Sequence, residues 1–237
     1  MKDKYFIYKK KKFIYNDELD GGASYHANLF IPVLKKLNGK FYKCMEMFAG
    51  VGITGLSLVL DNICDHIDLV DINQGVSDYV FYNIKSASLE SKARFIISDL
   101  FKNVDDHKYD LIIGNPPRIP DPSNVEPSKY LKAVDVDYHI HKEFLKHLYA
   151  YLNPAGFALL LEDYNNMPLS KLYGIINSYE TYYYEVIKPS FLESFKAVNI
   201  AFSGRSISVH KPKNFMFMIY ETIRWKNIFY FIRIKIK

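Results

Sequence analysis

The residues best suited to chemistry lie near the middle of the chain, where an apolar run at 109–113 is followed by Asn115-Pro116-Pro117. The prolines fix their φ angles and stiffen the loop, and the asparagine adds an amide. If Asn115 Oδ1 and the Pro116 carbonyl both accept from one NH2 group, they orient its nitrogen lone pair toward an electrophile. This arrangement suits an amide or aromatic amine, whose lone pair is delocalised. The alternative is a double proline that only ends a strand.

A glycine-rich turn follows an earlier apolar run at 42–48. Gly50 and Gly52 have no Cβ, so the backbone can bend sharply and a ligand can approach it closely. A helix expected at 54–60 would direct its first amide groups at that ligand. Glu46 precedes the turn, and its carboxylate would repel a pyrophosphate but favour a ligand that carries an amino group and a sulfonium.

Two more acidic residues stand at the ends of apolar runs. Asp71 lies about 20 residues beyond the glycine turn, where a carboxylate can accept from both hydroxyls of a ribose. The neighbouring Ile72 would then lie against an adenine. A helix cap is a second role for Asp71, and the two roles are compatible. Asp99 follows the run at 94–97, where Asp is also common turn chemistry.

In this order, the glycine turn, the acidic strand ends and the Asn-Pro-Pro loop resemble the class I S-adenosylmethionine (SAM)-dependent methyltransferases, over roughly residues 40–165. The loop resembles motif IV of the N-methyltransferases, which methylate amino groups of adenine or guanine in nucleic acid and glutamine in translation release factors. The chain resembles the small-domain and release-factor glutamine N-methyltransferase type of this group. The resemblance implies that SAM is the cofactor, that the acceptor is a nitrogen, and that Asn115, Pro116 and Pro117 are catalytic.

The resemblance also implies a set of cofactor-binding residues around the first three strand ends. They are Glu46, Phe48, Ala49, Gly50, Gly52, Asp71, Ile72, Asp99 and Leu100. Phe48 stands where the family usually has a glycine. Other functions stay open: O- or C-methylation of a metabolite, a noncatalytic module that binds SAM or nucleic acid, or a nicotinamide oxidoreductase, which the acidic Glu46 disfavours.

Arg118 departs from the family pattern, which has an aromatic residue after the two prolines. A guanidinium can stack on a base or an amide plane, or pair with a carboxylate or phosphate. A solvated loop charge is the alternative. We expect Arg118 to bind the substrate. The expected methyl acceptor is an RNA, a protein or a small molecule.

Tyr138 and His139 are the other substrate-binding candidates, at the start of a helix expected at 137–152. Asp137 is the expected N-cap of this helix, with His139 or His141 lining the substrate mouth. Residues i and i+2 of a helix do not share a face, so these two histidines do not indicate a metal site.

Expected strands alternate with expected helices, which predicts an α/β fold. The fold class is Rossmann-like and doubly wound: a mostly parallel seven-stranded sheet, helices on both faces and an antiparallel C-terminal strand. Residues 1–38 are expected to form an N-terminal arm and helix, and residues 39–237 the methyltransferase domain. Strands are expected at 42–48, 67–72, 94–97, 109–113, 157–161, 181–187 and 215–222, and helices at 27–37, 54–60, 75–87, 137–152 and 169–178. The tyrosine-rich residues 179–184 are expected to form an edge strand. The basic and aromatic tail at 225–237 is expected either to contact RNA or a membrane surface or to form an edge strand whose lysines prevent aggregation.

The composition is that of an ordinary globular protein of 237 residues, with 49% hydrophobic and 24% charged residues. The net charge of +5 is compatible with an anionic partner such as RNA but does not require one. Two cysteines, Cys44 and Cys64, do not imply a disulfide framework. The chain lacks an apolar stretch of about 18 residues and an apolar leader, so we expect a cytoplasmic protein without membrane insertion.

Overall fold

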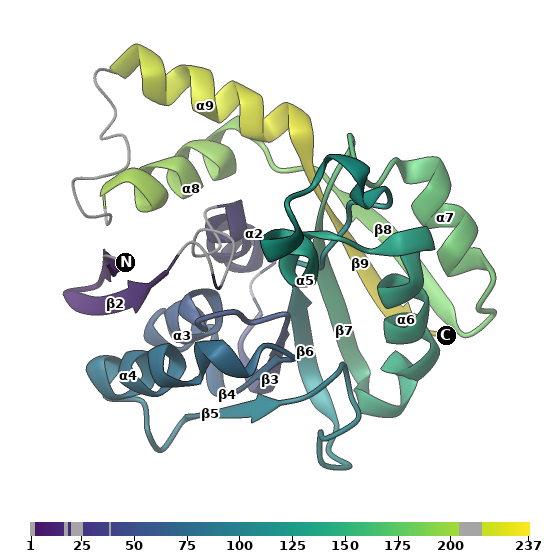
Figure 1. Ribbon diagram of the computed structural model, residues 1–237, viewed down its shortest axis with the longest axis horizontal. Coiled ribbons are helices and arrows are strands. Elements are labelled where there is room, and N and C mark those ends of the chain that lie inside the picture. The colour runs from purple at the N-terminus through teal and green to yellow at the C-terminus, as the bar shows by residue number, and fades with distance from the viewer. Residues whose placement is uncertain (1–2, 17–18, 20–25, 38, 204–214) are drawn as a thin grey trace.

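The computed structural model describes residues 3–16, 19, 26–37, 39–203 and 215–237 (Figure 1). Within these residues, seven strands form one sheet in the order β5-β4-β3-β6-β7-β9-β8. The first five strands of this order are parallel, and β9 is antiparallel to both β7 and β8. The expected fold class is therefore confirmed. The strands are β3 Phe41–Met47, β4 Cys64–Asp71, β5 Ala93–Ile97, β6 Tyr109–Gly114, β7 Leu152–Asp163, β8 Tyr182–Ile187 and β9 Phe229–Ile236.

Helices cover both faces of the sheet, with α3 and α4 on one side and α6 and α7 on the other (Figure 1). None of the described helices is both long and apolar enough to cross a membrane. The α-helices are α2 Phe30–Lys36, α3 Ile53–Leu60, α4 Ser77–Ala87, α5 Tyr130–Ala133, α6 His139–Tyr151, α7 Leu169–Asn177, α8 Phe191–Ser203 and α9 Phe215–Ile228. Short 3-10 helices are η1 His26–Leu29, η2 Gln74–Val76, η3 Pro122–Asn124, η4 Pro127–Lys129 and η5 Val136–Tyr138.

Alternating side chains of the central strands build two apolar cores. On β3, Cys44 belongs to the core under α3 and α4, whereas Met45 and Met47 belong to the core under α6 and α7. On β6, Leu111 faces the first core and Ile112 the second. Successive residues of a strand point to opposite faces, so a strand covered on both sides is apolar at almost every position. This buried sheet fixes where each strand ends.

The expected N-terminal arm is a hairpin of β1 Lys4–Tyr8 and β2 Lys11–Tyr15. Asn83 of α4 ties it to the domain, because its Oδ1 accepts from the Ile14 amide at 2.7 Å and its Nδ2 donates to the Ile14 carbonyl at 3.0 Å. The same Nδ2 also donates to the Val51 carbonyl in the glycine turn at 3.0 Å. The domain boundary at residue 38 stays a prediction, and residue 38 itself lies outside the described residues.

The expected strand at 215–222 is wrong, because these residues begin the helix α9. An unbroken apolar run such as 215–220 does not distinguish a strand from a buried helix. The helical spacing lies further along, where Met218, Thr222 and Trp225 are buried on one face. Helix α8 was not expected at all.

The C-terminal tail is an interior strand, which corrects its expected place at the edge. The last strand, β9, lies between β7 and β8, and β8 is the edge strand, as expected for the tyrosine-rich segment. β7 also starts earlier than expected, at Leu152, so the Asn153-Pro154 step lies inside the strand and not in a loop. The pairing of β6 with β7 shifts its register between Tyr109 and Leu111, which accommodates this start.

Two glycines provide a matched test of this packing. A Cβ on Gly156 would lie 2.7 Å from the Tyr109 carbonyl oxygen and 3.0 Å from that of Asp110, whereas a Cβ on Gly174 in α7 would meet nothing within 4 Å. We expect Gly156→Ala to lower the free energy of unfolding by about 1–3 kcal/mol. Gly174→Ala should raise it by about 0.5–1 kcal/mol, because alanine favours a helix. Equal effects in chemical denaturation would contradict the described start of β7.

Candidate functional site

The register of the sheet brings the glycine turn and the Asn-Pro-Pro loop to the same edge. Met47, at the end of β3, pairs with Val70 of β4 on one side and with Gly114 of β6 on the other. The residues that follow these three positions are Phe48, Asp71 and Asn115. A Cβ on Gly114 would lie 3.2 Å from the Phe48 ring, so the two segments are in close contact. The carboxyl ends of neighbouring parallel strands therefore form one site.

The glycine turn has a left-handed backbone at three positions. The φ angles are 61° at Phe48, 52° at Gly50 and 76° at Gly52. Glycine adopts such angles freely, but Phe48 is strained by them. The Gly50 amide donates to Asp71 Oδ2 at 2.7 Å, and the Gly52 amide donates to the Ala49 carbonyl at 2.8 Å. The end of β4 thus fixes the shape of the turn.

Glu46 lies inside the turn and not on its surface. It is 4% exposed, and its Oε2 accepts from the Gly55 amide at 2.7 Å. Burial raises the pKa of Glu46 to about 8, although the hydrogen bonds from Gly55 and Thr54 lower it and the charge of Asp71 raises it further. Glu46 therefore holds the first turn of α3 in place. Gly55, its partner, was not among the residues expected from the sequence.

Asp71 and Ile72 sit at the end of β4 with different exposure. Asp71 Oδ1 accepts from the Asn73 amide at 2.8 Å, and burial raises the pKa of this carboxyl above its usual range while the backbone amides of Asn73, Gly50 and Ile72 lower it. Each carboxylate oxygen has a second lone pair for a ligand hydroxyl. Ile72 is 47% exposed, although it is apolar. An exposed apolar side chain beside a carboxylate fits an adenosyl group.

A cavity of about 600 Å³ lies beyond the end of β5. Asp99 and Leu100, two expected cofactor residues, line it together with His139, an expected substrate residue. Leu100 has a φ of 51°, and Asp99 pairs with Lys102 Nζ at 2.5 Å. The other lining residues are Phe101, Lys102, Ile140, Glu143, His147 and Tyr151.

The Asn-Pro-Pro loop is pinned by the segment that precedes α6. Pro116 and Pro117 are buried and Asn115 is half-buried. The backbone amides of Arg118 and Ile119 both donate to the Ala133 carbonyl, at 3.0 and 2.9 Å. The backbone that follows the two prolines is therefore anchored to Ala133.

Arg118 is buried against this loop, which excludes the solvated loop charge. It is 9% exposed. Its Nη2 donates both to Asn115 Oδ1 and to the Pro116 carbonyl, the latter at 3.1 Å. Its Nη1 donates to Asp163 Oδ2 at 3.4 Å, and its Nε lies 3.6 Å from Glu162 Oε2. Stacking on a planar group and pairing with a carboxylate or phosphate were the expected contacts of Arg118. In the structure the guanidinium pairs with carboxylates.

His141 lies in a buried ion pair and not at a substrate mouth, which corrects that expectation. Its Nδ1 lies 2.5 Å from Asp135 Oδ2 and its Nε2 lies 3.1 Å from Glu162 Oε1. Burial lowers the pKa of His141, but the two carboxylates outweigh burial and raise it to about 9. Within the described ranges, no group of His, Cys, Asp or Glu side chains has a geometry that could hold a metal ion.

Asp135, and not Asp137, caps helix α6. Its Oδ1 accepts from the Ile140 amide at 2.7 Å. The expectation for Asp137 is wrong because the helix begins later, at His139, after left-handed backbone at Asp137 and Tyr138. Tyr138 is 8% exposed, and its hydroxyl donates to the Asn166 carbonyl at 3.1 Å.

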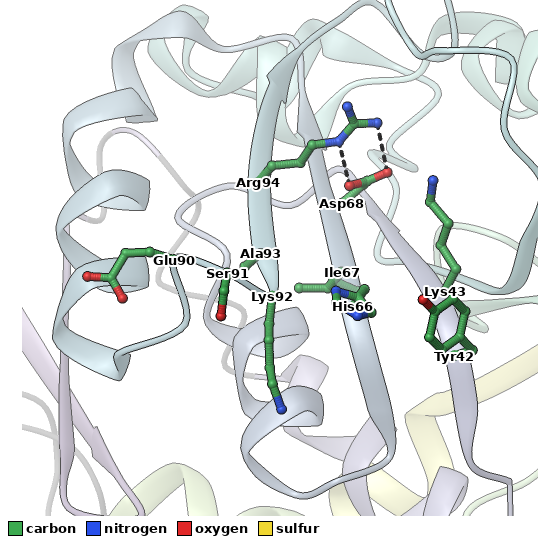
Figure 2. Close-up of a pocket in the computed structure, with 10 residues that line it drawn as sticks. All are labelled: Tyr42, Lys43, His66, Ile67, Asp68, Glu90, Ser91, Lys92, Ala93 and Arg94. Atoms are coloured by element: carbon green, nitrogen blue, oxygen red, sulfur yellow. Dashed lines mark hydrogen bonds and ion pairs between the residues drawn. The ribbon is translucent and has the colours of Figure 1, made fainter.

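A second cavity, of about 340 Å³, lies at the amino ends of β3, β4 and β5 (Figure 2). Arg94 forms two hydrogen bonds with Asp68 there, at 2.7 and 3.1 Å, as the dashed lines in Figure 2 mark. Because parallel strands carry their ligands at the carboxyl ends, this cavity is separate from the site around Asn115.

Two variants of Glu46 distinguish the role of its side-chain volume and hydrogen bond from the role of its negative charge. Because the raised pKa leaves the side chain mostly protonated at pH 7, Glu46→Gln should change the free energy of unfolding by less than about 1 kcal/mol and keep SAM binding. Glu46→Ala leaves the Gly55 amide unpaired beside a void and should cost about 2–4 kcal/mol. Thermal unfolding and calorimetric titration with SAM measure both effects. Loss of SAM binding in a stable Glu46→Gln variant would mean that the charge itself contacts the ligand.

The ion pair of His141 predicts a pH-dependent stability. A histidine pKa raised from 6.5 to about 9 contributes stability that is complete below pH 6.5 and lost as pH rises through 9. The difference in unfolding free energy between the wild type and His141→Gln should therefore shrink over that window in urea titrations. A difference that is constant across this window would show that His141 is neutral in the folded protein.

Comparison with known proteins assigns the family. Residues 15–174 match the model of the methyltransferase small domain family. The ribosomal protein uL3 glutamine methyltransferase of Francisella tularensis is 29% identical over 126 residues, which cover 49% of this chain and 40% of that protein. The release factor glutamine methyltransferase of Fusobacterium nucleatum is 28% identical over 131 residues, covering 51% of this chain and 37% of that protein.

The chain spans less than half the length of these two relatives. Among solved structures, TYW2 of M. jannaschii in complex with AdoMet is similar with a TM-score of 0.52 and 14% identity, over 99% of this chain and 87% of that one. At this identity the likeness concerns the fold. The family model covers more than half of the chain, so the chain belongs to the methyltransferase small domain family, a family of SAM-dependent methyltransferases.

Proposed function

We propose that this protein transfers the methyl group of SAM to an acceptor nitrogen held by Asn115 and Pro116. The observation that carries the proposal is the convergence of two oxygens on one nitrogen. Asn115 Oδ1 and the Pro116 carbonyl both accept from a single atom, Nη2 of Arg118. One NH2 group can therefore donate both of its protons to this pair of oxygens, which we call the acceptor corner. This is the binding mode that an acceptor amine needs.

The corner promotes the reaction by orientation. Two hydrogen bonds to the protons of an NH2 group fix its plane, so the nitrogen lone pair points away from both oxygens. The buried prolines and the bonds to the Ala133 carbonyl hold the oxygens in place before the acceptor arrives. SAM, when bound, supplies a methyl group already activated by the sulfonium.

The glycine turn is the proposed cofactor site. Asp71 would accept from the ribose hydroxyls, Ile72 would lie against the adenine, and Asp99 and Leu100 would contact its edge. Phe48, Ala49, Gly50 and Gly52 would supply backbone around the amino-acid part, with Glu46 holding their turn. The exposed apolar Ile72 beside the Asp71 carboxylate supports this assignment.

We propose a side-chain amide of a protein as the acceptor. The two relatives described above are named for glutamine methylation, one of ribosomal protein uL3 and one of a release factor. An amide NH2 has the two donors that the corner accepts. We also propose a cytoplasmic location, because the described cysteines Cys44 and Cys64 are both free thiols, as a reducing compartment favours.

Replacement of Asn115 tests the proposal. Asn115→Ala removes one of the two oxygens, so methyl transfer should fall about 100-fold while SAM binding stays unchanged. The rate of methyl transfer is measured with radiolabelled SAM and the protein fraction of a cell extract. The affinity for SAM is measured by calorimetry. Asn124→Ala, at an exposed asparagine of η3, is the matched control and should keep full activity. Transfer that survives in Asn115→Ala would contradict the proposed corner.

A further inference from the structure

The acceptor corner is already occupied by a side chain of the protein itself. Arg118 Nη2 takes both oxygens, Asn115 Oδ1 and the Pro116 carbonyl, and its Nε adds a second bond to the same carbonyl at 3.2 Å. A guanidinium is planar and carries NH2 groups, like the amide that the corner is proposed to receive. An acceptor cannot bind these oxygens while the guanidinium remains there.

Two buried carboxylates keep the guanidinium in this place. Asp163 accepts from Nη1 at 3.4 Å, and Glu162, which is fully buried, lies 3.6 Å from Nε. Glu162 Oε1 pairs with His141 at 3.1 Å, whereas Glu162 Oε2 has no hydrogen-bond partner within the described residues and faces the positive charge of Arg118. The backbone of Arg118 is fixed by the Ala133 carbonyl, which leaves side-chain rotation as the way out.

We propose that Arg118 is a specificity-determining residue that occupies the acceptor position when no acceptor is bound. Only a planar group with an NH2 donor can then displace the guanidinium and bind Asn115 Oδ1 and the Pro116 carbonyl. This inference rests on the proposed function, which identifies the Asn115 and Pro116 oxygens as the place where the acceptor binds. The site itself is a guanidinium-binding pocket made by Asn115, Pro116, Glu162 and Asp163. The pocket is selective because an acceptor must bind it more favourably than the guanidinium of Arg118 does.

Arg94 offers a matched control at the other end of the sheet. It also binds a carboxylate, that of Asp68, with two hydrogen bonds (Figure 2). Unlike that of Arg118, its side chain is 45% exposed. It contacts neither Asn115 nor Pro116 in the hydrogen bonds of the described residues. Removal of Arg94 therefore deletes a guanidinium without opening the acceptor corner.

The first test uses free guanidinium ion as the probe and does not depend on methyl transfer. Arg118→Ala empties the pocket, so millimolar guanidinium chloride should raise its melting temperature relative to sodium chloride at equal ionic strength. The wild type and Arg94→Ala should show no such rise. Arg118→Ser, which also leaves the pocket empty and adds a hydroxyl for the buried polar groups, replaces Arg118→Ala if that variant fails to fold. A double variant that also carries Asn115→Ala should lose the effect. Equal response of Arg118 and Arg94 variants would overturn the proposal.

The second test measures methyl transfer into the protein fraction at limiting acceptor. Arg118→Ala should raise the initial rate up to about tenfold, and guanidinium ion should inhibit this variant but not the wild type. A rate that falls and does not respond to guanidinium would overturn the proposal and make Arg118 a substrate-binding residue. If the proposed function fails, no variant transfers methyl groups, yet guanidinium still stabilises Arg118→Ala. The two failures are thus distinguishable.

Discussion

The parallel pairing of β3 with β6 is the constraint on which the site depends. It sets Met47 opposite Gly114, so the chain leaves both strands at the same level and the glycine turn meets the Asn-Pro-Pro loop. Packing around Gly114 is tight here, since a Cβ would lie 3.0 Å from Leu160 Cδ2 and 3.2 Å from the Phe48 ring. A shift of one residue would turn Asn115 to the opposite face of the sheet. The position of Asn115 beside the glycine turn is thus a consequence of strand register.

A buried set of charges surrounds the loop on its other side. Arg118 and His141 face Asp135, Glu162 and Asp163, all of them nearly inaccessible to solvent. Buried charges are unfavourable unless they are paired, and each of these has an opposite charge beside it. Left-handed backbone at Phe48, Leu100 and Tyr138 lies at the same edge of the sheet. Strain and buried charge concentrated in one region are typical of a site that serves function more than stability.

The sequence predicted the parts of the site that depend on local pattern. The strand ends, the glycine turn and the Asn-Pro-Pro loop follow from apolar runs and from the properties of glycine and proline, and the sheet was predicted with them. The roles of the individual site residues stay predictions.

Contacts between distant residues were not predictable. Arg118 and Asp163 are 45 positions apart, and nothing near Arg118 in the sequence indicates that partner. Glu162 and Asp163 follow β7, so their position at the carboxyl edge was the available signal. Helix α9 was missed because its first residues are apolar without a period, and the cap of α6 because two residues with left-handed backbone displace its start.

A crystal structure with S-adenosylhomocysteine tests the central claim most directly. The account predicts that the ribose hydroxyls meet Asp71, that the sulfur lies between the Gly50 turn and the Asn115 side chain, and that the Asn115 amide oxygen faces the same space as the sulfur. A nucleoside bound at the amino ends of the strands beside Arg94, or an Asn115 side chain screened from the sulfur by other residues, would contradict it.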